Sequence, residues 1–192
     1  MKHLAVPYVF GSKSQVEFEI TDLDQMEERL RKSGFIDPGN NHQRFLYVIA
    51  FAVMTAGDHV LVVEKSSGER VLGFGKPITW RPDIVGYNRR SFILQTLYDE
   101  LDLYVPGSSY DIYQVALIHD AEHEYASLGC VFFMELKSQL RKFAVGNRIL
   151  SMECVDDLRQ GSFPFKGWSG KILDYLAAKE MANVAATKRT VF

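Results

Sequence analysis

Three acidic residues close together stand out as groups that could do chemistry. Asp99, Glu100 and Asp102 lie in the stretch QTLYDELDL, which spans residues 95–103. In a helix, carboxylates three or four residues apart share a face and can bind one hard cation such as Mg²⁺. The same carboxylates would also be ordinary on the solvated face of a helix. The surrounding elements must decide between a metal site and a solvated surface.

The segment NRRSFILQTLYDELDLY, residues 88–104, has the periodicity of an amphipathic helix. Its apolar stripe consists of Ile93, Leu94, Leu97 and Leu101. Asn88 is a suitable N-cap for this helix. The periodicity places Asp99 and Asp102 on the face opposite the stripe, and Glu100 at the edge of the stripe. The acidic residues are therefore expected on a well-defined helix.

The other segments predict a mixed sheet. Strand-like runs such as RFLYVIAFAVMT and HVLVVEK precede this helix, and SYDIYQVALIH and YASLGCVFFMEL follow it. A final helix contains GWSGKILDYLAAKEM. The order of strands, helix, strands and helix predicts an α/β (α+β) sandwich and argues against a doubly wound parallel sheet.

We expect three segments along the chain. Residues 1–38 form a lead-in with strands and a helix, for which Thr21 and Asp24 supply N-cap chemistry and Gly34 the end. Residues 39–180 form the main domain, and residues 181–192 form a tail. A strand of the lead-in at a sheet edge would allow a homodimer.

Composition excludes several classes of function. Apolar residues make up 47% of the chain, and the formal net charge is −2. These values carry no strong signal for nucleic-acid binding, and no apolar run approaches the roughly 20 residues of a membrane span. Cys130 and Cys154 lack metal-ligand spacing, and Cys130 lies in an apolar run that suggests burial. A cytoplasmic location is the default expectation.

Three motifs together resemble the Nudix superfamily over roughly residues 44–178. GFGKPI and YDELDL are similar to segments of a predicted-phosphoesterase branch, and GWSGKIL is similar to the start of the last Nudix helix. The resemblance implies an α/β/α sandwich with a mixed sheet. It also implies Mg²⁺ or Mn²⁺ as cofactor and hydrolysis of a diphosphate bond in a nucleotide or related small molecule.

The signature helix of this family reads R-E-U-x-E-E-x-G-U, where U is aliphatic, and it is only partly present here. Leu97, Leu103 and Glu100 match the pattern. Asp99 stands where the pattern has a glutamate, whose side chain is one methylene longer. Before this helix the full motif has a glycine and, six residues later, a glutamate, and here these positions hold Lys76 and Pro82. Within the helix, Gln95 and Thr96 replace the Arg-Glu pair, and Asp102 replaces the glycine. The box is therefore degenerate, with two of its three metal-binding carboxylates.

The resemblance assigns roles to the residues that are left. Asp99 and Glu100 would be the catalytic and metal-binding carboxylates, and Glu122 or Glu124 would complete the metal shell. The alternative for Asp99 and Glu100 is a solvated helix face, and the placement of the two glutamates is inferred from topology alone.

The same resemblance suggests four ligand-binding residues. Lys76 and Arg90 would bind phosphate, and Trp80 and Tyr87 would stack on a base. Ordinary surface residues, or contacts to a partner protein, are the alternatives.

Two functions follow from these expectations. The first is a metal-dependent hydrolase of nucleoside diphosphate-linked compounds. The second is a catalytically inactive Nudix fold that binds a nucleotide or a protein partner. The loss of the Arg-Glu pair at Gln95 and Thr96 motivates the second function.

Overall fold

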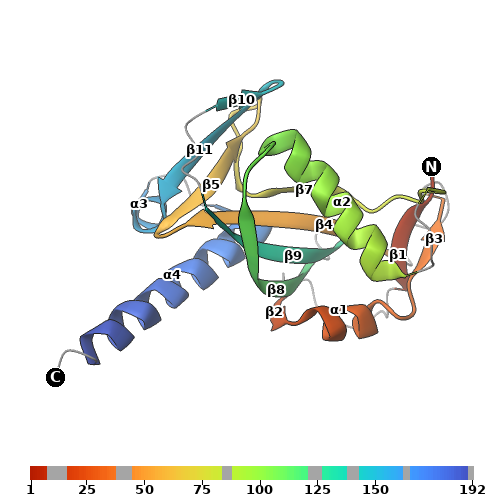
Figure 1. The fold of residues 1–192 in the computed structure, drawn as a ribbon, viewed down its shortest axis with the longest axis horizontal. Coiled ribbons are helices and arrows are strands. Elements are labelled where there is room, and N and C mark those ends of the chain that lie inside the picture. Colours follow the sequence, from red (N-terminus) through yellow and green to blue (C-terminus); the bar gives the residue numbers. More distant parts are fainter. Residues whose placement is uncertain are drawn as a thin grey trace.

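The structure is a computed structural model, and it describes residues 1–7, 17–37, 45–83, 88–120, 127–137, 143–161 and 165–189. Within these residues the chain forms one mixed sheet with helices on both faces (Figure 1). The strands are β1 (His3–Pro7), β2 (Glu17–Thr21), β3 (Gly34–Ile36), β4 (Phe45–Ala56), β5 (His59–Glu64), β6 (Arg70–Leu72), β7 (Phe74–Pro77), β8 (Tyr110–Asp120), β9 (Ser127–Leu136), β10 (Phe143–Val145) and β11 (Arg148–Cys154). The helices are α1 (Leu23–Arg29), α2 (Arg89–Tyr104), α3 (Val155–Gln160) and α4 (Gly167–Arg189).

Strands β4 and β9 form the centre of the sheet and run parallel to each other. The main path of hydrogen-bonded strands is β10-β11-β5-β4-β9-β8-β2, and its other neighbours are antiparallel. β4 is apolar almost throughout because helices cover both faces of the sheet at this point. The long apolar run in the sequence therefore marks the central strand.

Alternate side chains of β4 enter two different cores. Val48, Ala50, Ala52 and Met54 lie in a core with α1 and α2. Phe51 and Val53 pack instead with α3 and α4 on the opposite face. This arrangement is the α/β/α sandwich with a mixed sheet that the sequence predicts. No helix in the described ranges is both long enough and apolar enough to cross a bilayer.

The lead-in is built into the same sheet. β1 pairs with β3 and β4, and β2 pairs with β8 at the end of the sheet path. The N-cap of α1 is Asp22, whose side chain accepts a hydrogen bond of 2.8 Å from the backbone N–H of Gln25. The prediction of Thr21 and Asp24 as caps is wrong, because Thr21 is still paired in β2 and Asp24 already lies in the first turn.

Two predictions about this segment have different outcomes. The helix does not extend to Gly34, which instead begins β3, because the turn around Leu30 ends the helix earlier. The predicted homodimer through this segment stays a prediction.

Two glycines allow β7 to approach β4 closely. Gly73 has a φ of +87°, and it lies where the chain leaves β6, a partner of β5, and enters β7, a partner of β4. A Cβ atom would lie 2.1 Å from the carbonyl oxygen of Ala52 at Gly73, and 2.2 Å from that of Ala50 at Gly75. The GFG stretch is thus explained by backbone packing.

Candidate functional site

Helix α2 holds the acidic residues in a fixed orientation. Asn88 caps it by accepting a 2.9 Å hydrogen bond from the backbone N–H of Arg90. Ile93, Leu97 and Leu101 are buried against the sheet, as the apolar stripe predicts. This packing leaves Asp102 exposed and places Glu100 toward the sheet.

Glu100 forms an ion pair with Lys76 of β7. The Nζ atom of Lys76 lies 2.9 Å from Oε1 of Glu100, whose side chain is only 9% exposed. Lys76 is paired with Ala50 in the sheet, so its side chain extends on the same face as α2. A carboxylate with so little solvent needs a charged or hydrogen-bonding partner, and Lys76 supplies one.

Asp99 forms an ion pair with Arg81, a residue of the segment that follows β7. The same guanidinium donates from Nε and Nη2 to the two carboxylate oxygens of Asp83, at 3.2 Å and 2.7 Å. Gln95 donates a further hydrogen bond of 3.0 Å to Oδ1 of Asp99. The hydrogen bonds from Arg81 lower the pKa of the Asp83 carboxyl. Asp99 and Glu100, the two helix acids that the resemblance assigns to a metal, therefore each have a cation of the chain as partner.

The side chains described around α2 do not form a ligand set for a divalent cation. In the part of the chain that the structure describes, no group of three His, Cys, Asp or Glu side chains is placed to hold a metal ion. Mg²⁺ requires about six oxygen ligands in near-octahedral geometry. Thr96, at the position of the third carboxylate, is buried and carries no charge.

Glu122 and Glu124 lie outside the described residues, so their metal-binding role stays a prediction. The catalytic and metal-binding roles of Asp99 and Glu100 also stay predictions.

Of the four predicted ligand-binding residues, the three that the structure describes are not brought together. Lys76 lies at the carboxylates, whereas Arg90 forms an exposed ion pair of 3.2 Å with Asp24 of the lead-in. Arg90 and Asp99 are about 13 Å apart along the helix axis, from the usual rise per residue. Trp80 stacks on Phe92 at 5.5 Å between ring centroids. Tyr87 lies outside the described residues.

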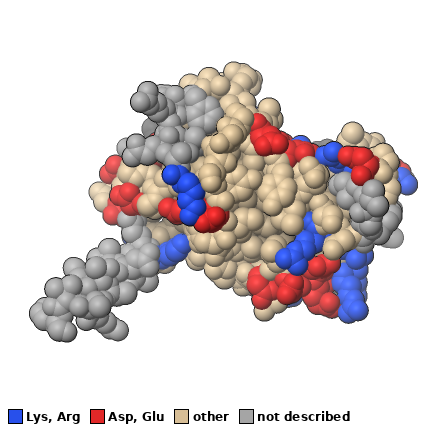
Figure 2. Space-filling model, in the orientation of Figure 1, with Lys and Arg blue, Asp and Glu red and all other residues tan. Residues whose placement is uncertain are grey.

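Charges on the face in Figure 2 are interspersed. Acidic and basic side chains lie side by side around α1, where Arg29 pairs with Glu19 and Arg31 pairs with Glu28. The centre of this face carries few charged side chains.

A pocket of about 520 Å³ lies between the β5–β6 hairpin, β7 and the start of α4. Its lining includes the aromatic residues Phe51, Phe74 and Trp168 and the basic residues Lys65, Arg148 and Lys166. Glu69 is a lining acid, and it pairs with Lys65 at 2.9 Å. The basic charges therefore exceed the acidic ones in this lining.

The GWSGKIL motif positions the start of α4 at this pocket. The ring of Trp168 packs on Gly129, where a Cβ atom would approach it to 2.5 Å. The hydroxyl of Ser169 accepts a 3.0 Å hydrogen bond from the backbone N–H of Leu72. The sequence interpretation used this motif only as a family resemblance and missed the pocket. The sequence signal for the pocket is Trp168 and Ser169 close to the basic residue Lys166 at the start of a helix.

Comparison with known proteins supports the fold. No family model matches the sequence, and no curated protein matches it at a significant level. Among solved structures, the chain is similar to the crystal structure of Tm1382, described as "a putative Nudix hydrolase". The TM-score is 0.66 at 18% sequence identity, and the match covers 96% of this chain and 100% of that chain. At this identity the likeness establishes a shared Nudix-like fold, and that fold includes the lead-in.

Proposed function

We propose that this protein is a binding module with a Nudix-like fold. It holds a nucleotide or another diphosphate-containing small molecule without a divalent metal, and it does not hydrolyse the ligand. The observation that carries this proposal is the pairing of Glu100 with Lys76 and of Asp99 with Arg81. The similar structure of Tm1382 is described as "a putative Nudix hydrolase", and the paired acids of this chain support binding over hydrolysis.

The ion pairs work against metal binding and against catalysis. A divalent cation at α2 would have to displace Lys76 and Arg81 from the carboxylates that they neutralise. Thr96 offers no third negative charge to compensate for that displacement. Without the metal, the acidic part of the helix has no group that would activate water for attack on phosphorus.

The pocket at the start of α4 provides what such a ligand requires. Trp168 and Phe51 offer apolar ring surface for a planar group. Lys166 and Arg148 offer positive charge for phosphate oxygens. The first backbone N–H groups of a long helix lack partners within the helix and favour an anion at that end.

Calorimetric titration with ADP in the presence of EDTA tests the proposal. We expect saturable binding that Mg²⁺ does not strengthen. Lys166→Gln should weaken it several-fold, because one charged phosphate contact is lost. The matched control is Lys171→Gln within α4, an exposed residue outside the pocket lining, which should leave the affinity unchanged.

The alternative function, hydrolysis, predicts a different result. Mg²⁺ or Mn²⁺ would then support hydrolysis of the phosphoanhydride bond in ADP or a related diphosphate, and Glu100→Gln would abolish this hydrolysis. That pair of results would overturn the proposed binding function.

A further inference from the structure

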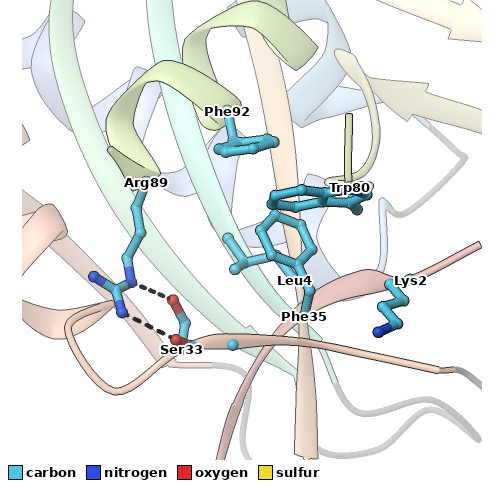
Figure 3. A pocket seen from close by; sticks show the side chains of 8 residues that line it. Lys2, Leu4, Ser33, Phe35, Trp80, Arg89 and Phe92 are labelled. Atoms are coloured by element: carbon cyan, nitrogen blue, oxygen red, sulfur yellow. Dashed lines mark hydrogen bonds between the residues drawn. The ribbon is translucent and has the colours of Figure 1, made fainter. Parts of the chain in front are cut away.

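We propose a second ligand site in the cavity of about 510 Å³ between the lead-in and the start of α2, for a small aromatic anion (Figure 3). The cavity is lined by β1, β3, the segment after β7 and the first residues of α2. Its volume falls in the range of about 300–1,000 Å³ that is typical of small-molecule pockets. The site goes beyond the proposed function, since it shares no lining residue with the pocket at α4.

Three aromatic side chains form the wall of this cavity. Trp80 stacks on Phe92 at 5.5 Å and meets Phe35 edge-on at 5.2 Å. Phe92 is buried, whereas Trp80 and Phe35 are half-buried. Trp80 and Phe35 both line the cavity, where a planar ring could pack against them.

Two cations lie on either side of the aromatic wall, Arg89 and Lys2 (Figure 3). Arg89 donates from Nε to the hydroxyl of Ser33 at 2.8 Å and from Nη2 to its carbonyl oxygen at 3.1 Å. These two hydrogen bonds fix the guanidinium plane and leave other N–H groups for a ligand. A fixed guanidinium is a preorganised partner for a carboxylate or a phosphate.

The described residues that line this cavity do not compensate its positive charge. Among the described residues, neither Lys2 nor Arg89 forms an ion pair, and the cavity lining contains no carboxylate. This lining differs from the acidic helix, where Lys76 and Arg81 are both paired with carboxylates. A lining with hydrogen-bond donors, positive charge and rings selects an anion with a planar apolar part, and it disfavours cations.

Backbone hydrogen bonds hold the walls of the cavity in place. The N–H of Trp80 donates to the carbonyl of Lys2 at 2.9 Å, and the N–H of Leu4 donates to the carbonyl of Ile78 at 2.8 Å. Lys2, one of the two cations, is thus hydrogen-bonded through its backbone to Trp80 of the aromatic wall. The site is preformed, so binding does not have to order it.

The two tryptophans of the chain allow separate measurements of the two pockets. Trp80 lines this cavity and Trp168 lines the pocket at α4. In the Trp168→Phe variant, fluorescence reports on Trp80 alone. In the Trp80→Phe variant, it reports on Trp168 alone, so a failure of one site is distinguishable from a failure of the other.

The experiment is a fluorescence titration of Trp168→Phe with 4-nitrobenzoate and with 4-nitrophenyl phosphate, two anionic quenchers. We expect saturable quenching by at least one of the two anions, and the anion with the lower Kd shows whether the site prefers a carboxylate or a phosphate. Adding Arg89→Gln should raise the Kd of that anion about tenfold, as for the loss of a charge-assisted hydrogen bond. Lys2→Gln should raise it several-fold. The matched control is Lys32→Gln, an exposed lead-in residue outside the lining, and it should have no effect.

Three results would overturn the site. They are quenching that stays linear with concentration for both anions, equal quenching by the neutral 4-nitrobenzamide, and a Kd unchanged by Arg89→Gln and Lys2→Gln. Because Arg89 also binds Ser33, its loss could disturb the fold. Lys2 is exposed and Arg89→Lys keeps the charge, so these two variants decide the question in that case.

Discussion

The ammonium group of Lys76 lies 2.9 Å from a carboxylate oxygen of Glu100, and this pair joins β7 to α2. At the neighbouring position of the helix, Arg81 reaches Asp99 from the segment after β7. Positive charge thus comes from the chain itself at the place where the Nudix resemblance implies a metal ion. This substitution is the basis of the proposed function.

The first prediction concerns the strength of the Lys76–Glu100 pair. Lys76→Met leaves the Glu100 carboxylate buried without its partner, and we expect a loss of about 1–2 kcal/mol in the free energy of unfolding. This is less than the roughly 3–5 kcal/mol for a fully buried pair, since Lys76 is 42% exposed and solvent screens it. Urea denaturation at neutral pH measures the loss.

The control for that prediction is another lysine–glutamate pair. Lys65 and Glu69 are both exposed, so Lys65→Met should cost less than about 0.5 kcal/mol. The double variant Lys76→Met with Glu100→Gln should recover most of the stability. Equal effects of Lys76→Met and Lys65→Met would contradict the structural role given to Lys76.

The second prediction concerns the two glycines beside Lys76. Gly73→Ala should lower the free energy of unfolding by at least about 2 kcal/mol, because the added Cβ meets the Ala52 carbonyl at 2.1 Å and φ is positive. Gly34→Ala is the control, since a Cβ there meets nothing within 4 Å and its φ is not in the positive range. Chemical denaturation compares the two, and a similar cost for both would show that the GFG stretch has another role.

The third prediction is a pH dependence at Asp83. Hydrogen bonds from Arg81 lower the pKa of this carboxyl in the folded protein. The stability that it contributes is therefore fully present above its unfolded pKa of about 3.9 and is lost as the pH falls through the lower folded value. NMR titration should give a pKa below the usual value for Asp83, and Arg81→Gln should raise it.

Arg31→Gln serves as the control in that titration, because Arg31 pairs with Glu28 elsewhere on the surface. An Asp83 pKa that does not respond to Arg81→Gln would mean that the guanidinium is held mainly by Asp99.

Much of the fold could be predicted because its signals are local. The apolar stripe of α2 and the Asn88 cap lie within one continuous segment, and both are confirmed. The burial of Cys130 is confirmed for a similar reason, since it lies within an apolar strand. The predicted caps of α1, Thr21 and Asp24, lie one residue before and two residues after the observed cap Asp22, because pairing of Thr21 in β2 decides where the helix begins.

The candidate site could be predicted only in part. The sequence locates the acids on α2, but it says nothing of Arg81, which is 18 residues from Asp99 and reaches it through the tertiary fold. The sequence shows only that Lys76 follows the GFG stretch. Its contact with Glu100 depends on the register of β7 against β4. Contacts of this kind depend on strand register and loop course, which local patterns do not determine.

The central claim is that chain cations occupy the acidic helix in place of a metal, and Mn²⁺ binding measured by electron paramagnetic resonance tests it most directly. The signal of free Mn²⁺ should be unchanged by an equimolar amount of the wild-type protein. The double variant Lys76→Gln with Arg81→Gln, which frees Glu100 and Asp99, should reduce that signal. Loss of the free signal with the wild-type protein, abolished by Glu100→Gln, would contradict the account.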